Sequence, residues 1–157
     1  MDNQAYSFTS LQDNAHFDRS HRDSLPSDSF QPENSLHVST PHEAALAIQH
    51  RLRNCKSSYA VRNIDLSQIQ GLTNDRAPRA GDLVLARIDR LRQHARIELP
   101  SGRRAYLHVG DEVLLLYGNR YATDQFEARV PDDLGPCHMV AAGGIAARMI
   151  SRCSAVK

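Results

Sequence analysis

From Gly81 onward, apolar and polar residues alternate with a period of two, which is typical of β-strands. Two segments in this region, 83–88 and 113–117, are apolar at nearly every position, as in strands that are buried on both faces. Pro100-Ser101-Gly102 has the composition of a hairpin turn. The pattern predicts five short strands, at 83–88, 96–99, 103–108, 113–117 and 126–130.

Five strands joined by short turns predict an antiparallel meander, and a meander this short buries itself best by closing into a small barrel. We therefore expect a mainly β fold, a five-stranded antiparallel barrel of the SH3-like or OB-like kind. Gly81-Asp82 and Gly110-Asp111 each precede one of the two apolar strands. Glycine permits a tight turn, and the aspartate can accept hydrogen bonds from backbone N–H groups there, so we interpret the repeated Gly-Asp pair as a feature of the fold.

An α-helix is predicted ahead of the strands. Thr40 suits the N-cap, Pro41 suits the first helical position, and Glu43 completes a capping box. The following segment, 44–52, is a good helix former and carries Ala45, Ile48 and Leu52 on one face. A second, single-turn helix is expected at 65–68, and the polar residues 73–80 are expected to link it to the barrel.

The C-terminal segment 135–150 is apolar and rich in small residues, and it is compatible with two structures. It can form one helix, or a strand at 138–142 that turns at Gly143-Gly144 into a helix at 145–152. Adjacent glycines inside a helix cost about 1 kcal/mol each relative to alanine, which favours the second structure. Both predict a helix at the C-terminus.

Residues 1–38 are rich in Ser, Asp, Asn, Gln and His, and their isolated apolar residues are too sparse to repay the entropy of ordering. A disordered arm is predicted; the alternative is that its Phe-containing pieces dock on a partner. The expected organisation is thus an arm at 1–38, a helix and linker at 39–78, and a barrel with a C-terminal helix at 79–157.

The net charge of the 157-residue chain is +1, with 19 basic and 18 acidic side chains, and gives no general reason to expect nucleic acid or an anionic membrane. The charge is uneven, because residues 1–40 hold two basic and six acidic side chains. Cys55, Cys137 and Cys153 lack metal-ligand spacing and fit a reducing compartment. The N-terminus has no secretion signal, so a cytoplasmic location is expected. No metal or cofactor motif is recognisable.

The densest polar cluster lies at 117–127 and combines aromatic, basic, amide and acidic side chains. Tyr and Arg supply contact area together with directed hydrogen bonds, so such a mixture recognises a protein partner or a small polar ligand. The alternative is a well-fastened turn with Asn119 in the left-handed conformation and Arg120 paired with Asp124. The candidate binding residues are Asn119, Arg120, Tyr121, Asp124, Gln125 and Glu127.

Two weaker candidates lie farther along the chain. Cys137 and His138 have the chemistry of a nucleophile and its base, but neighbouring residues in a strand face opposite sides. Gly143-Gly144 would present N–H groups to an anion if a helix followed directly. A small enzyme or enzyme subunit using these residues is therefore the alternative to a binding module.

A basic group precedes the polar cluster and defines a third possibility, a nucleic-acid-binding barrel. Acidic Asp89 and Glu98 interrupt the group, and Tyr106 is the one aromatic residue nearby. The main prediction therefore remains a non-catalytic binding or accessory module acting through the 117–127 hairpin. The basic group consists of Arg87, Arg90, Arg92, Arg96, Arg103 and Arg104, with His94.

Overall fold

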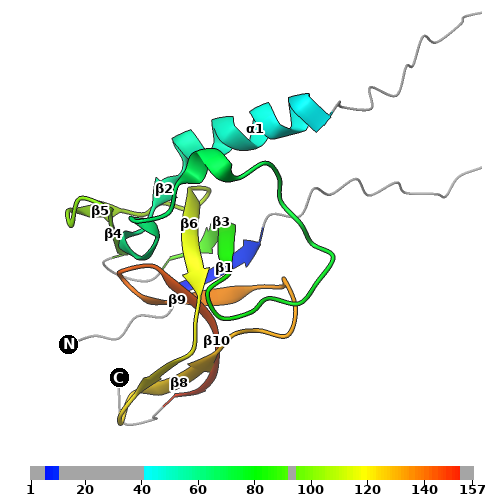
Figure 1. Cartoon of the computed structure of the whole chain (residues 1–157). Helices are drawn as coiled ribbons and strands as arrows, with labels where there is room; N and C mark the ends of the chain where they lie inside the picture. The colour runs from blue at the N-terminus through cyan, green and yellow to red at the C-terminus, as the bar shows by residue number, and fades with distance from the viewer. Residues whose placement is uncertain (1–5, 11–40, 92–94, 153–157) are drawn as a thin grey trace, which may run out of the picture.

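The structure, a computed structural model, describes residues 6–10, 41–91 and 95–152 (Figure 1). These residues form one α-helix, α1 (Pro41–Asn54), two single-turn 3-10 helices at Tyr59–Val61 (η1) and Leu66–Gln68 (η2), and ten strands. No helix of the described part is long and apolar enough to cross a membrane. The strands are β1 (Tyr6–Ser10), β2 (Lys56–Ser57), β3 (Leu83–Arg90), β4 (Arg96–Glu98), β5 (Arg104–Tyr106), β6 (Glu112–Tyr117), β7 (Arg120–Ala122), β8 (Phe126–Arg129), β9 (Cys137–Ala141) and β10 (Ile145–Arg152).

Eight of these strands form one mixed sheet in the order β2-β6-β3-β1-β9-β10-β8-β7, so the predicted five-stranded antiparallel barrel is wrong. The five predicted strands all exist, but they do not form a meander. β3 pairs directly with β6, and β4 pairs with β5 in a separate two-stranded hairpin. β6 also pairs in parallel with β2 and with β10, which a meander does not allow. The sheet therefore contains both parallel and antiparallel pairs and is not the predicted five-stranded antiparallel barrel.

The C-terminal helix is also wrong, because its residues form strand β10. The predicted strand before the glycine pair is present as β9, and the chain turns at Gly143-Gly144 back into β10, which pairs with β9, β8 and β6. Ala146 and Ala147 are completely buried in these contacts. Their small side chains favour a helix locally, but pairing with three strands outweighs that preference.

The N-terminal helix is confirmed as α1, which begins at Pro41. The predicted N-cap, Thr40, lies outside the described residues. Leu52 is buried and packs with Leu85 and Leu114, so α1 covers one face of the β3–β6 pair. The predicted single turn at 65–68 is confirmed as η2, where Asp65 accepts a hydrogen bond from the Ser67 N–H at 3.0 Å.

Strands β3 and β6 are buried on both faces, as predicted. Leu85 and Leu114 face α1, whereas Val84 and Leu115 belong to the larger cluster on the other face. Leu115 is completely buried there, among side chains from β3, β4, β6, β9 and β10. This pair of strands therefore forms the centre of the core.

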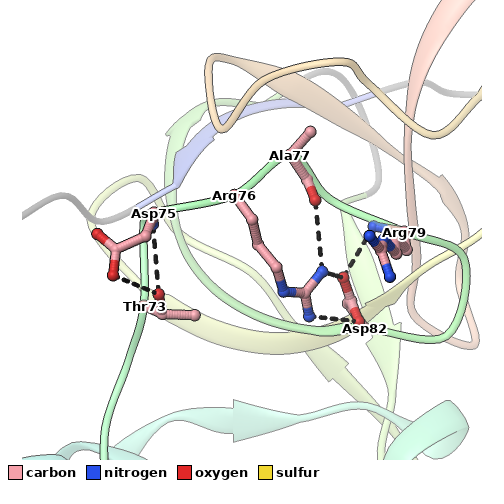
Figure 2. Close-up of polar contacts among 6 residues, drawn as sticks. All are labelled: Thr73, Asp75, Arg76, Ala77, Arg79 and Asp82. Atoms are coloured by element: carbon pink, nitrogen blue, oxygen red, sulfur yellow. Dashed lines mark hydrogen bonds and ion pairs between the residues drawn. The ribbon is translucent and has the colours of Figure 1, made fainter.

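The repeated Gly-Asp pair marks two equivalent turns at opposite ends of the β3–β6 pair. The Asp82 carboxylate accepts a hydrogen bond from the Arg79 N–H at 2.8 Å, and Asp111 accepts one from His108 at 2.7 Å. Figure 2 shows the first turn, where the Arg76 guanidinium donates to both carboxylate oxygens of Asp82 at 2.7 and 3.0 Å. Lys56 plays the corresponding part at Asp111. The repeated Gly-Asp pair therefore has a structural role in these turns, as predicted.

Part of the predicted arm belongs to the sheet. Strand β1 lies within residues 1–38 and pairs with both β3 and β9. The rest of the arm, residues 1–5 and 11–38, lies outside the described residues. The proposed division of the remaining chain into 39–78 and 79–157 stays a prediction.

Candidate functional site

The β7–β8 hairpin ends the sheet and carries the predicted binding residues. β7 pairs with β8 on one side and is the last strand in the sheet order. A shallow pocket of about 400 Å³ lies on this hairpin. Four of the six predicted residues line it, together with two others; the lining consists of Asn119, Arg120, Tyr121, Glu127, Ala128 and Arg129.

Asn119 and Arg120 fix the shape of this pocket. The Asn119 side-chain oxygen accepts a hydrogen bond from the Val130 N–H at 2.8 Å, which ties the two ends of the hairpin together. The Arg120 guanidinium donates to the Val140 carbonyl on β9 and lies 5.5 Å from the centre of the Phe126 ring. Asn119 therefore closes the base of the hairpin, and Arg120 holds the hairpin against β9.

The proposed fastening of this turn is wrong in its details. Asp124, with a φ of 59°, adopts the left-handed conformation that we expected of Asn119. Arg120 donates to a backbone carbonyl instead of pairing with Asp124. Asp124 and Gln125 belong to the connecting turn, where the Gln125 N–H donates to the Ala122 carbonyl at 3.0 Å, and neither lines the pocket.

The outer side of the hairpin is open to contact. Tyr121 is 73% exposed and stands opposite Glu127 in the strand register. Glu127 accepts a hydrogen bond from Arg129 at 2.8 Å, and the Arg129 side chain remains 67% exposed. An exposed ion pair of this kind contributes little to stability, so both partners can exchange it for contacts with a ligand.

The sequence interpretation missed Arg129 and Ala128. A signal was present, because the apolar residues Phe126 and Ala128 alternate with Glu127 and Arg129 in the last predicted strand. Strict alternation then places Glu127 and Arg129 together on the outer side, as the structure shows.

Cys137 and His138 do not form a nucleophile and base. Cys137 is completely buried, and burial raises the pKa of its thiol to about 12, so the thiol is protonated at neutral pH. His138, the next residue of β9, is half-buried, and its Nδ1 accepts a hydrogen bond from the Met149 N–H at 3.4 Å. The two side chains therefore differ in surroundings, as the alternation of a strand predicts.

Gly143 and Gly144 lie in the turn between two strands, so no helix presents its N–H groups there. The Gly144 N–H donates to the Ala141 carbonyl at 2.9 Å within the turn. The Gly143 carbonyl accepts from Ala60 at 2.8 Å, and the Gly144 carbonyl accepts from Leu116 at 3.0 Å. These bonds join the turn to neighbouring segments, and an anion site that depends on a helix is excluded.

Within the described ranges, no group of three or more His, Cys, Asp or Glu side chains is placed to hold a metal ion. A scan against models of protein families and searches of curated proteins and solved structures found no match to this chain. No relative therefore indicates which residues act, and the β7–β8 pocket is the candidate that the geometry favours.

Proposed function

We propose that the protein is a non-catalytic binding module whose β7–β8 hairpin binds a partner protein. The observation that carries this proposal is the shallow pocket at the end of the sheet, with the exposed Tyr121 and Arg129 beside it. Tyr and Arg dominate the binding energy of many protein interfaces, because they combine large contact area with directed hydrogen bonds.

The division of labour within the hairpin supports this function. Asn119 and Arg120 are fixed by hydrogen bonds to Val130 and Val140, so the floor of the pocket is rigid before binding. Tyr121 and Arg129 are exposed and make the contacts. A preorganised surface loses less conformational entropy on binding, and this raises affinity.

The shape of the pocket favours a protein partner over a small polar ligand. Sites for small molecules usually bury most of the ligand surface, whereas this pocket is shallow. A side chain that projects from a partner fits it, with the rest of the interface lying on the outer side of the hairpin. The pairing of Glu127 with Arg129 indicates that the inserted side chain is polar.

Selection of binders from a random peptide library displayed on phage tests the proposal on the full-length protein. Peptides that bind the wild type should lose at least tenfold in affinity to Tyr121→Ala and to Arg129→Ala, with melting temperatures within about 2 °C of the wild type. Tyr106→Ala is the matched control, because Tyr106 is 58% exposed on a different hairpin, and it should retain binding. If the selected peptides bound all three variants equally, the hairpin would not be the binding site.

Arg120→Ala separates the structural role from the contact role. Removing the guanidinium leaves the Val140 carbonyl without this donor, so we expect a loss of stability of roughly 1–3 kcal/mol together with weaker binding. A variant that bound weakly at unchanged stability would instead place Arg120 among the contact residues.

A further inference from the structure

The β4–β5 hairpin forms a sheet of its own and carries an uneven distribution of charge. Between Arg96 and Tyr106 it carries three arginines, Arg96, Arg103 and Arg104, against one acidic residue, Glu98. In Figure 1 this hairpin lies at the upper left, far from β8 at the bottom. It is therefore a surface separate from the proposed partner site.

The tip of this hairpin carries two exposed arginines. Arg103 and Arg104 are both exposed, and neither forms an ion pair with another residue of the described part. Glu98 stands opposite Arg104 in the register but is not within ion-pair distance of it. Glu98 therefore stands beside Arg104 without forming an ion pair with it.

An arginine side chain stacks on a tyrosine ring at the base of the same hairpin. The Arg96 guanidinium lies 4.4 Å from the centre of the Tyr106 ring and donates to its hydroxyl, and the ring remains 58% exposed. Lys56 donates to the Tyr106 carbonyl at 2.9 Å and also pairs with Asp111, which holds this end of β5 in place. The exposed ring is therefore held firmly at the surface.

Arg96, Glu98 and Arg104 lie on the same face of the hairpin as Tyr106, because they alternate with the inward-facing Ile97 and Ala105, so this face carries two arginines against one carboxylate. A surface that carries arginines beside an exposed aromatic ring suits single-stranded nucleic acid. The phosphates of the strand bind arginine, and its bases stack on the ring. We infer that the β4–β5 hairpin binds single-stranded nucleic acid, with Arg103 and Arg104 on phosphates and Tyr106 against a base. This inference does not depend on the proposed partner site.

Fluorescence anisotropy with a labelled 15-nucleotide oligothymidylate, titrated with the full-length protein between 50 and 200 mM salt, tests the inference. Each phosphate contact to a single strand contributes about 0.7 to the slope of log affinity against log salt. Arg103→Ala/Arg104→Ala should therefore bind more weakly and lower the magnitude of the slope by about 1.4. The control Arg62→Ala/Arg79→Ala removes the same charge from exposed positions elsewhere and should stay within about twofold of the wild type.

The tyrosine variants test the stacking contact. Tyr106→Ala should lower affinity about 5- to 150-fold with an unchanged salt slope, whereas Tyr106→Phe keeps the ring and should remain within about twofold. Melting temperatures of all variants identify a loss that results from unfolding, and Tyr106→Phe keeps the test valid if Tyr106→Ala is unstable.

Three results would overturn the inference. The first is the absence of binding at 50 mM salt, and the second is an equal loss in the Arg62/Arg79 control. The third is competition by polyglutamate as strong as that by unlabelled oligonucleotide, which would show a surface for acidic chains in general. Competition by the oligonucleotide alone, with the losses stated above, supports it.

Discussion

Gly144→Ala should be among the most destabilising single substitutions in this protein. A Cβ atom at this position would lie 2.0 Å from the Ser58 Cβ and 2.1 Å from its Oγ, and Ser58 is completely buried. The φ angle of Gly144 is +102°, a conformation that costs an L-residue about 1–2 kcal/mol. Forcing an extra methyl group into a packed interior adds about 1–3 kcal/mol, so we expect a total loss of roughly 2–5 kcal/mol.

Gly143→Ala is the matched control, because the neighbouring glycine has no atom within 4 Å of its would-be Cβ and no positive φ. Urea unfolding followed by circular dichroism should show a change within about 0.5 kcal/mol for Gly143→Ala. The double variant Ser58→Gly/Gly144→Ala should destabilise less than the sum of its two single changes, because Ser58→Gly removes the overlapping side chain. If Gly144→Ala lowered the free energy of unfolding by less than 1 kcal/mol, the close contact between Gly144 and Ser58 would be refuted.

Three further predictions concern the core, the thiols and the Gly-Asp turns. Leu115→Ala should lose about 2–5 kcal/mol in chemical denaturation, and a loss below 1 kcal/mol would contradict its place in the core. Cys137 should resist iodoacetamide at pH 8 until the protein unfolds, as mass spectrometry of the labelled peptides will show; rapid labelling of the native protein would contradict its burial. Burial opposes ionisation of Asp111, but the hydrogen bonds from Lys56 and from the His108 N–H, together with the charge of Lys56, outweigh it and lower the pKa of this carboxyl below its usual value. The resulting stabilisation is present above about pH 4 and is lost as the pH falls through the folded-state pKa of Asp111. Below pH 4 the urea midpoint of Asp111→Asn should therefore change less with pH than the midpoint of the wild type. Parallel curves of midpoint against pH would refute this contribution.

The elements that the sequence predicted correctly are those in which local pattern and burial agree. β3 and β6 are apolar at consecutive positions because α1 covers one of their faces and the larger cluster covers the other. α1 begins at Pro41, where the fixed φ of proline suits a first helical turn. Neither signal depends on distant parts of the chain.

The errors arose where distant contacts decide the structure. The segment 145–152 has small apolar residues that suit a helix, and only its pairing with β9, β8 and β6 makes it a strand. Strand order suffered in the same way, because short turns suggested a meander while β3 in fact pairs with β6. The alternation of apolar and polar residues identifies a strand but does not show which other strand it pairs with.

Four of the predicted site residues share one pocket, but the sequence did not predict the structural role of each residue. The composition of the hairpin identified Asn119, Arg120, Tyr121 and Glu127, which line one pocket. That Asn119 and Arg120 fasten the hairpin follows from bonds to Val130 and Val140, 11 and 20 residues away, and no local pattern encodes them.

Hydrogen–deuterium exchange of the full-length protein with and without a selected peptide tests the central claim most directly. A partner held at the β7–β8 hairpin should slow exchange in residues 119–129 and leave the β4–β5 hairpin at 96–106 unchanged. Slower exchange confined to 119–129, and its absence in Tyr121→Ala at the same peptide concentration, is the result that we predict. Protection elsewhere, with 119–129 unaffected, would contradict the assignment of this hairpin as the binding site.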